Sequence, residues 1–269
     1  MDTFLKHSAV YMDKKSTASS HHKLISEKPL KIIIQDRLYS IIMRTPGDEL
    51  PLAAGFCLSE GIVNKPDDIE SLSFSNKSDG NEVILSLKKS KRNEIFQLFE
   101  KFSLSSKKEF NIGYSHVIRN HSQKIYPVKK DDIKLDFSNA LNCLENLSSI
   151  QPLRKITRSS HAAALYSSDF ELLSVSEDVG RHNALDKTIG KLFLDNTLCK
   201  ASLLILSSRI SCELVQKAAM AGIPVILAIS RPTSNAVKLA SQLNITIACL
   251  AEKSGLYVFC GKSRLVSYK

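Results

Sequence analysis

The sequence predicts an α/β protein: a mixed β-sheet with parallel crossovers in the C-terminal half, and a smaller N-terminal α/β part. After Thr157, short apolar runs alternate with longer stretches in which apolar residues recur at helical spacing. Strands that are apolar throughout are typical of a sheet that is covered on both faces and whose parallel strands are joined by helices. Hairpin signals accompany this alternation, so the predicted sheet is mixed.

Residues 1–27 are polar, rich in Ser, His and Lys and without a hydrophobic period, so a flexible N-terminal tail is expected. Residues 28–130 are expected to form the smaller α/β subdomain, in which turn sequences such as Pro46-Gly47 separate the elements. The pattern fails between 103 and 127, where a flexible basic loop is expected. The expected elements are strands over 30–34 and 38–43, a helix from 48 or 49 to about 61, two strands within 71–87 and a helix over 93–102.

Residues 131–269 are expected to form the second, cofactor-binding domain. Its centre is the stretch SEDVGRHNALDKTIG at 176–190, which follows a strand-like run and continues into apolar residues spaced as one buried helical face. The stretch is therefore a strand-to-helix turn. The other expected elements are a helix near 137–144, a hairpin about Ser168-Asp169, and then helices from 183, over 213–220 and over 235–243 that alternate with strands over 201–206, 225–229 and 245–250.

Composition excludes several classes of protein. No run of about 18 apolar residues occurs, and the N-terminus has no apolar core followed by a small-residue cleavage site. We therefore expect a cytoplasmic protein with no membrane partner. The six cysteines are spread widely and none forms a Cys-x-x-Cys pair, so reduced thiols are expected and neither a disulfide framework nor a metal site is predicted.

The formal net charge is +10, and most of the excess is local. Residues 88–130 contain eleven Lys or Arg against three Glu. A basic patch of this kind favours an anionic partner, whether nucleic acid, a phosphate-bearing cofactor or an acidic protein surface, and a solvated basic face is an equal alternative. The absence of Trp argues against nucleic acid, which we do not expect as a partner.

Three strand-to-helix turns fall in succession, at 177–183, 207–211 and 230–235, and each carries an arginine. Parallel crossovers place such turns along one edge of a sheet, where free backbone N–H groups and the helix dipole favour a bound anion. Together they predict a phosphate or nucleotide cradle; alternatively, the hydroxyls are helix caps and the arginines point into solvent. The arginine of the third turn is Arg231. The candidate binding residues are Asp178, Arg181, His182, Asn183, Ser208, Arg209, Ser230, Thr233 and Ser234.

His161 begins an apolar strand and could reach the same edge, although a histidine in such a position is often a satisfied structural group. Other reaction classes find little support. The sequence contains no GxGxxG after a strand, no GxxxxGK[ST], no GxSxG elbow and no zinc-deaminase pattern. Hydride transfer, kinase and serine-hydrolase chemistry are therefore not predicted.

Several stretches together carry a family resemblance. EDVGRHNALDKTIG at 177–190 closely resembles the signature of the FdhD family of formate dehydrogenase accessory proteins. The resemblance extends to RTPGDELPLAAGFCLSEGIV at 44–63, to HAAALYSSDFELLSVSEDVG at 161–180 and to SSRISCELVQKAAMAGIPVILAISRPTSNAVKLASQLNITI at 207–247. It covers the chain from about Glu27 onward, and the sequence is thereby identified as a member of that family.

This resemblance implies an α/β fold similar to that of cytidine deaminases but without their zinc, and a homodimer. It also implies a role in maturing formate dehydrogenase: accepting sulfur as a persulfide from a cysteine desulfurase and passing it to the molybdenum cofactor, bis-molybdopterin guanine dinucleotide. The guanine nucleotide ends are what the three turns would hold, with GDP as a surrogate. A further cofactor-binding segment is implied at Leu250, Ala251, Glu252, Lys253, Ser254 and Gly255, although Glu252 and Gly255 stand where arginine is expected.

The resemblance places a sulfur-carrying Cys-x-x-Cys loop at NIGYSHV, 111–117, which contains no cysteine. Sulfur transfer needs a thiolate, so no catalytic residue is assigned among Asn111, Gly113, Tyr114, Ser115 and His116. Two functions stay open. In the first, a relocated cysteine carries the sulfur. In the second, the protein is a cofactor-binding chaperone without sulfur transfer. The candidates for a relocated cysteine are expected to be packed and therefore inert: Cys57, Cys212, Cys249 and Cys260.

Overall fold

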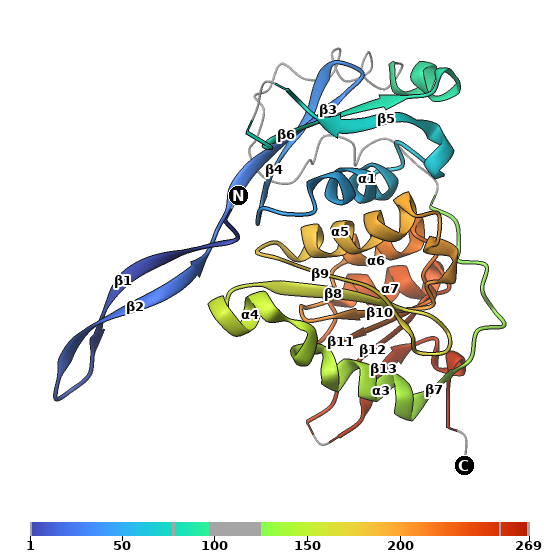
Figure 1. Ribbon diagram of the computed structural model, residues 1–269. Helices are drawn as coiled ribbons and strands as arrows, with labels where there is room; N and C mark the ends of the chain where they lie inside the picture. The colour runs from blue at the N-terminus through green and yellow to red at the C-terminus, as the bar shows by residue number, and fades with distance from the viewer. Residues whose placement is uncertain (1, 77–78, 97–124, 253, 268–269) are drawn as a thin grey trace.

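Two β-sheets lie on either side of a layer of helices (Figure 1). The structure is a computed structural model and describes residues 2–76, 79–96, 125–252 and 254–267. From one end to the other, the layers are a four-stranded sheet, helix α1 (Glu49–Ser59), helices α5 (Arg181–Leu194), α6 (Cys212–Met220) and α7 (Ser234–Gln242), a six-stranded sheet, and helix α3 (Phe137–Glu145). The mixed α/β class predicted from the sequence is confirmed at this level.

The four-stranded sheet belongs to the N-terminal part of the chain. Strand β3 (Lys28–Ile34) buries Leu30, Ile32 and Ile34 on one face, because successive side chains of a strand alternate between its faces. It pairs antiparallel with β4 (Arg37–Arg44) and parallel with β6 (Glu82–Leu87), which also pairs antiparallel with β5 (Ile69–Phe74). The predicted hairpin, the helix that follows it and the two further strands are all confirmed.

The six-stranded sheet has the order β13-β12-β11-β10-β8-β9. Its central strands β10 (Leu203–Leu206), β11 (Val225–Ala228) and β12 (Thr246–Leu250) are parallel, and their buried residues leave no polar face. Strand β8 (His161–Tyr166) pairs antiparallel with both β10 and β9 (Leu172–Asp178), so β9 runs in the direction of β10. The predicted alternation of helices and strands is confirmed; strand β13 (Leu256–Cys260) was not predicted.

The second face of this sheet has its own hydrophobic core. Helix α3 turns Ala140, Leu141 and Leu144 inward, and the Asp136 carboxylate accepts a hydrogen bond of 2.9 Å from Asn139 N at the start of the helix. Further elements of the described residues are β7 (Leu135–Asp136), α4 (Pro152–Thr157), β14 (Leu265–Val266) and the 3₁₀-helices Pro66–Asp68, Asn146–Ile150, Leu198–Lys200 and Lys262–Arg264.

The N-terminal segment corrects one expectation. Residues 1–27, expected as a tail without secondary structure, contain the antiparallel hairpin β1 (Phe4–Met12) and β2 (Thr17–Ile25), which projects away from the body of the molecule (Figure 1). At its turn, one Asp13 carboxylate oxygen accepts 2.7 Å hydrogen bonds from Lys15 N and Ser16 N. Most of the ribbon is exposed on both faces, so no alternation of apolar and polar residues marks it in the sequence.

Helices α1 and α5 cross at two glycines. A Cβ added at Gly55 would lie 1.9 Å from the Asp186 carbonyl oxygen, and one added at Gly190 would lie 1.8 Å from the Pro51 carbonyl oxygen. Only glycine allows the two backbones to approach so closely. This crossing joins the N-terminal part to the helices above the six-stranded sheet.

Most of the predicted basic loop lies outside the described residues. The helix predicted over 93–102 begins earlier than expected, because residues 89–96 are helical. The predicted sulfur-carrying loop, with Asn111, Gly113, Tyr114, Ser115 and His116, lies outside the described residues, as does Lys253.

Candidate functional site

The three predicted turns lie along one edge of the six-stranded sheet. Strands β9, β10, β11 and β12 all end at this edge and β8 begins there, because β8 runs opposite to its two neighbours. The backbone connects the turns. Ser207 N donates to Ala162 O at 3.1 Å, and Thr233 N donates to Ile210 O at 3.0 Å. Register places His161 opposite Asp178.

Basic side chains gather around His161, which is half-buried at the start of β8. Burial is the largest cause that lowers the pKa of this imidazole below its ordinary value. The charges of Arg181, Arg154 and Arg209 lower the pKa further, and the charge of Asp178 raises it. A surplus of positive charge on one edge favours an anionic ligand.

Two helices begin at this edge without a side-chain cap. Helix α5 is preceded by Gly180, which has no side chain to act as a cap, and α6 is preceded by Ser211, whose side chain accepts no capping hydrogen bond. Ser211 Oγ and Arg181 Nε are buried, and within the described part of the chain neither has a hydrogen-bond partner. Helix α7 differs, because Thr233 Oγ1 accepts from Ala236 N at 3.2 Å. The helix-cap alternative therefore holds for Thr233 but not at the other two turns.

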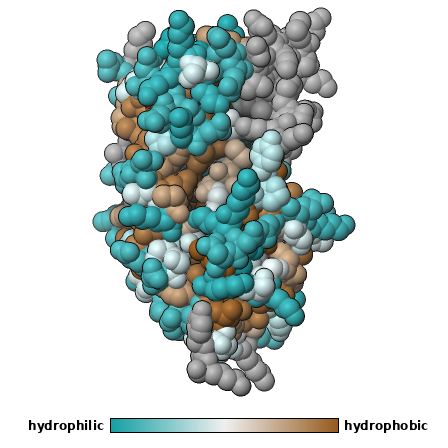
Figure 2. Space-filling model, turned by 90° about the vertical axis from the view of Figure 1, so that its right-hand side faces the viewer, coloured by the Kyte–Doolittle hydropathy of each residue, from teal (hydrophilic) through white to brown (hydrophobic). Residues whose placement is uncertain are grey.

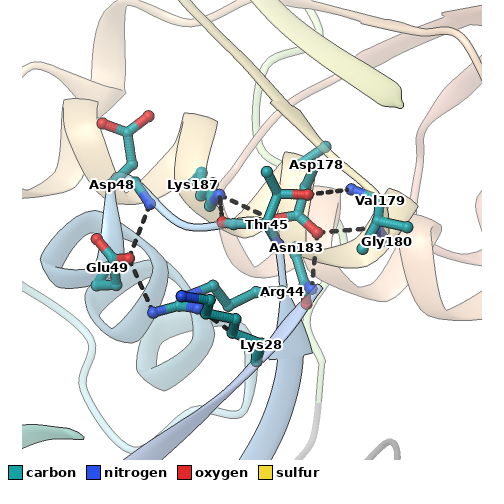
Figure 3. A network of polar contacts seen from close by, with 12 residues as sticks. Lys28, Arg44, Thr45, Asp48, Glu49, Asp178, Val179, Gly180, Asn183 and Lys187 are labelled. Atoms are coloured by element: carbon teal, nitrogen blue, oxygen red, sulfur yellow. Dashed lines mark hydrogen bonds and ion pairs between the residues drawn. The ribbon is translucent and has the colours of Figure 1, made fainter. Parts of the chain in front are cut away.

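Asp178, a predicted binding residue, is fully buried and has only partners within the protein (Figure 3). Its Oδ2 accepts from Thr45 N at 3.0 Å and faces Lys187 Nζ at 2.7 Å. Its Oδ1 accepts from Gly180 N at 2.8 Å and from Asn183 Nδ2 at 3.0 Å. Both oxygens are used, so Asp178 positions the turn, and Asn183, which also donates to Met43 O at 2.7 Å, supports it in the same way.

The N-terminal half supplies the other side of this network, which sequence reasoning missed. Thr45 accepts from Lys187 Nζ through its carbonyl oxygen at 2.8 Å and from Val179 N through its Oγ1 at 3.0 Å. The buried Arg44 guanidinium, whose pKa is lowered by burial and raised by Glu49, pairs with that carboxylate at 3.0 Å. No local signal connects these residues, because Thr45 and Asp178 are separated by 133 positions.

His182 and Ser208, also predicted to bind, are buried behind the edge. His182 Nε2 lies 2.7 Å from a Glu213 carboxylate oxygen, and one turn further along the same two helices Lys217 Nζ lies 2.8 Å from an Asp186 carboxylate oxygen. Burial raises the pKa of Asp186, which Lys217 partly offsets. These pairs join α5 to α6. Ser208 Oγ donates to Arg209 O at 3.1 Å, and Arg209 itself is exposed.

The third turn and the segment after β12 lie beside each other. The Arg231 guanidinium is 3.9 Å from a Glu252 carboxylate oxygen and lies over the Tyr257 ring, 5.7 Å from its centroid. Thr233 and Ser234 are exposed, and Ser230 is half-buried. Ala251 N donates to Gly255 O at 2.9 Å, which closes the segment into a turn. The predicted residues Leu250, Ala251, Glu252, Ser254 and Gly255 are thus brought to the end of the same edge.

The six thiols differ in environment. Cys57 and Cys249 are buried, and burial is the largest cause that raises the pKa of each. Burial also raises the pKa of the half-buried Cys143. Cys260 Sγ donates to Ile245 O at 3.3 Å, and Cys199 is exposed at the far end of α5. Cys212 is the first residue of α6, so it is the cysteine that begins a helix at the candidate edge.

A cavity of about 310 Å³ lies away from this edge, where α1, α5 and α6 end. On the face turned toward the viewer in Figure 2, hydrophobic residues gather in a hollow between the upper and lower parts of the molecule. Within the described ranges, no helix is long and apolar enough to cross a bilayer, and no three His, Cys, Asp or Glu residues are grouped to hold a metal ion. The cavity is lined by Leu58, Asn64, Lys65, Pro66, Phe193, Asn196, Leu198, Cys199, Met220, Ala221 and Gly222.

Comparisons with known proteins agree on one family. A family model described as FdhD/NarQ matches residues 25–266. The sulfur carrier protein FdhD of Picrophilus torridus is 34% identical over 245 residues, which are 89% of this chain and 90% of that protein. The protein of the same name from Streptomyces coelicolor is 32% identical, with 90% and 88% covered. A crystal structure described as a formate dehydrogenase accessory protein from Desulfotalea psychrophila has a TM-score of 0.77 at 20% identity and covers 98% of this chain and 100% of its own, which shows a shared fold.

Proposed function

The chain belongs to the FdhD/NarQ family, and on that premise we propose that it is an accessory protein of formate dehydrogenase that binds bis-molybdopterin guanine dinucleotide at the edge described above. The observation that carries the proposal is the basic edge itself. Two uncapped helix N-termini and three arginine-bearing turns meet there, and the buried Arg181 Nε has no partner within the described residues. Such a site suits the phosphate groups of a nucleotide.

The residues present fit a phosphate-bearing group. Arg181 and Arg209 would bind phosphate oxygens together with backbone N–H groups at the starts of α5 and α6, since neither helix start has a side-chain cap among the described residues. Arg231 and the exposed hydroxyls of the third turn would extend the site toward 250–255. Asp178 and Asn183 would hold the first turn in place. When bound, the cofactor supplies a molybdenum centre that accepts a sulfur ligand.

Whether the protein also transfers sulfur to the cofactor is a separate part of the proposal. Relatives are named sulfur carriers, and we extend that role to this chain as one of two alternatives, with a cysteine desulfurase as donor. Against it stands the absence of cysteine from 111–117, together with the burial of Cys57 and Cys249. The second alternative, a chaperone that binds the cofactor without covalent sulfur chemistry, is favoured by these same observations. A homodimer, a cytoplasmic location and a zinc-free likeness to cytidine deaminases complete the proposal.

Titration calorimetry of the full chain with GDP tests the cofactor site. We expect GDP to bind more tightly than guanosine, because the phosphates meet the arginines, and more tightly than ADP, because the family resemblance implies a guanine site. Equal affinity for GDP and ADP would leave a phosphate site without guanine selection. No binding of GDP would contradict the proposed site altogether.

A further inference from the structure

Helix α4 brings one more basic residue to the edge. Its N-terminus is fastened to Glu177, whose carboxylate oxygens accept from Leu153 N at 2.7 Å and from Arg154 N at 2.8 Å. The Arg154 guanidinium donates to Ser160 O at 2.8 Å, immediately before His161 in the chain. On the other side of His161, Ala162 N donates to Ser207 Oγ at 2.8 Å. Arg154 and the turn that carries Arg209 therefore flank the same histidine.

The charged groups that act on His161 come from different parts of the chain. Arg154 comes from α4, Arg181 from α5, Arg209 from the turn after β10, and Asp178 from β9. The single carboxylate among them is already paired with Lys187 at 2.7 Å. Glu177 pairs in register with Ala162, so alternation along β9 turns its side chain to the opposite face of the sheet. Among the described residues, three guanidinium groups therefore act on His161, and the one carboxylate that does so is already paired.

We propose that Arg154 is a fourth arginine of the anion site, and that His161 takes up a proton when a phosphate-bearing ligand binds beside it. This inference rests on the proposed function, because it concerns the same edge. It adds a residue outside the three turns and a dependence of binding on pH. The ligand class is a nucleoside diphosphate or another phosphate ester.

The sign of the pH dependence follows from electrostatics. In the free protein, burial and the three arginines hold the pKa of His161 below its ordinary value, so the imidazole is neutral near neutral pH. A phosphate placed among the arginines neutralises part of their charge and favours the imidazolium, which raises the pKa. The bound state then holds more protons than the free state, so affinity increases as the pH falls through the pKa that the imidazole has in the complex.

The test is calorimetry of the full chain with GDP between about pH 5.5 and pH 8. Measurements in two buffers that differ in ionisation enthalpy give the number of protons taken up on binding. The phosphate of GDP titrates near pH 6 itself, so the readout is the difference between the parent protein and His161→Asn. Arg154→Gln is expected to weaken GDP binding about tenfold, as the loss of one charge-assisted contact does. Arg158→Gln is the matched control: Arg158 follows the same helix, is exposed, and is not among the charges that act on His161.

Inorganic sulfate does not titrate over this range, so it provides a measurement that needs no variant. Any proton taken up when sulfate binds the parent protein must be bound by a group of the protein. Uptake that is present in the parent protein and lost in His161→Asn, together with weaker GDP binding by Arg154→Gln alone, is the expected result. GDP binding with the same proton uptake in the parent protein and His161→Asn, or with equal affinities for Arg154→Gln and Arg158→Gln, would overturn the inference and leave the proposed function standing. Absence of GDP binding by the parent protein would overturn both.

Discussion

Asp178 and Lys187 form a fully buried ion pair that joins two distant parts of the chain. Two charges removed from water are costly unless they are paired and their remaining hydrogen-bonding groups are satisfied. Here the carboxylate accepts from Thr45 N, Gly180 N and Asn183 Nδ2 besides facing Lys187 Nζ. The pair therefore fixes the position of the first turn relative to the N-terminal half.

Removal of one partner should expose this cost. Lys187→Met leaves the buried Asp178 carboxylate without its counter-charge, and we expect the free energy of unfolding to fall by about 3–5 kcal/mol in urea titrations. The matched control is Lys191→Met on the same helix, whose ion pair with Asp48 at 2.8 Å is partly exposed. Its loss should cost less than about 1 kcal/mol. Equal effects of the two substitutions would contradict a special role for the buried pair.

Arg209 is proposed to bind the ligand and is not part of the core, since its side chain is exposed at the second turn. Arg209→Ala is expected to weaken GDP binding by about 1.5–3 kcal/mol, the range for one charge-assisted contact to phosphate. Thermal unfolding should be unchanged. Lys238→Ala, an exposed lysine on α7, removes one positive charge elsewhere and serves as the control in the same calorimetric titration. Unchanged affinity of the Arg209 variant would count against the edge as the binding site.

At the scale of elements, the crossing of α1 and α5 depends on the absence of two side chains. In an open helix, replacing glycine by alanine stabilises by about 1 kcal/mol. At Gly55 and Gly190 the added methyl group would lie 1.9 Å and 1.8 Å from a backbone oxygen of the other helix. Gly55→Ala and Gly190→Ala should therefore each lower the free energy of unfolding by about 1–3 kcal/mol or more in denaturant titrations, which is opposite in sign to the effect in an open helix. A gain in stability from either substitution would show that the helices can separate freely.

The β1–β2 hairpin should be the least protected strand pair in the described structure. It pairs only with itself in its sheet, and most of its residues are exposed. A ribbon of two strands is marginally stable in water, so its backbone amides open often. Hydrogen–deuterium exchange measured by mass spectrometry is expected to be much faster in 4–25 than in the central strands β10 and β11. Equal protection would indicate that a further layer covers the ribbon.

The same element shows where prediction from sequence stops. The parallel strands were predictable because each is apolar throughout, and the helices between them because apolar residues recur on one face. The hairpin has no buried face and therefore no period to detect. Strand β13 differs from the hairpin, because Leu256–Cys260 is apolar throughout and its sequence carries the strand signal, although Tyr257, Val258 and Phe259 are exposed at the edge of the sheet.

At the scale of the whole molecule, the open question is whether sulfur passes through this protein. Incubation with a cysteine desulfurase, cysteine and labelled sulfur, followed by mass spectrometry of peptides, distinguishes a sulfur carrier from a cofactor chaperone. We expect no label on Cys57 or Cys249, because burial raises the pKa of each thiol and keeps it from the donor. Label on Cys212 would support transfer beside the proposed binding edge, and no label at all would support the chaperone. Label on Cys57 would contradict the buried environment.

The sequence by itself determined the α/β class, the order of most elements and the gathering of three arginine-bearing turns at one edge, because these depend on local periodicity and on the handed connection of parallel strands. Tertiary structure decided which predicted residues face outward. Asp178, Asn183 and His182 are turned inward by partners in Thr45, Met43 and Glu213. These partners lie 31 to 140 positions away along the chain, and spacing within a motif carries no information about contacts that only the packing of separate elements creates.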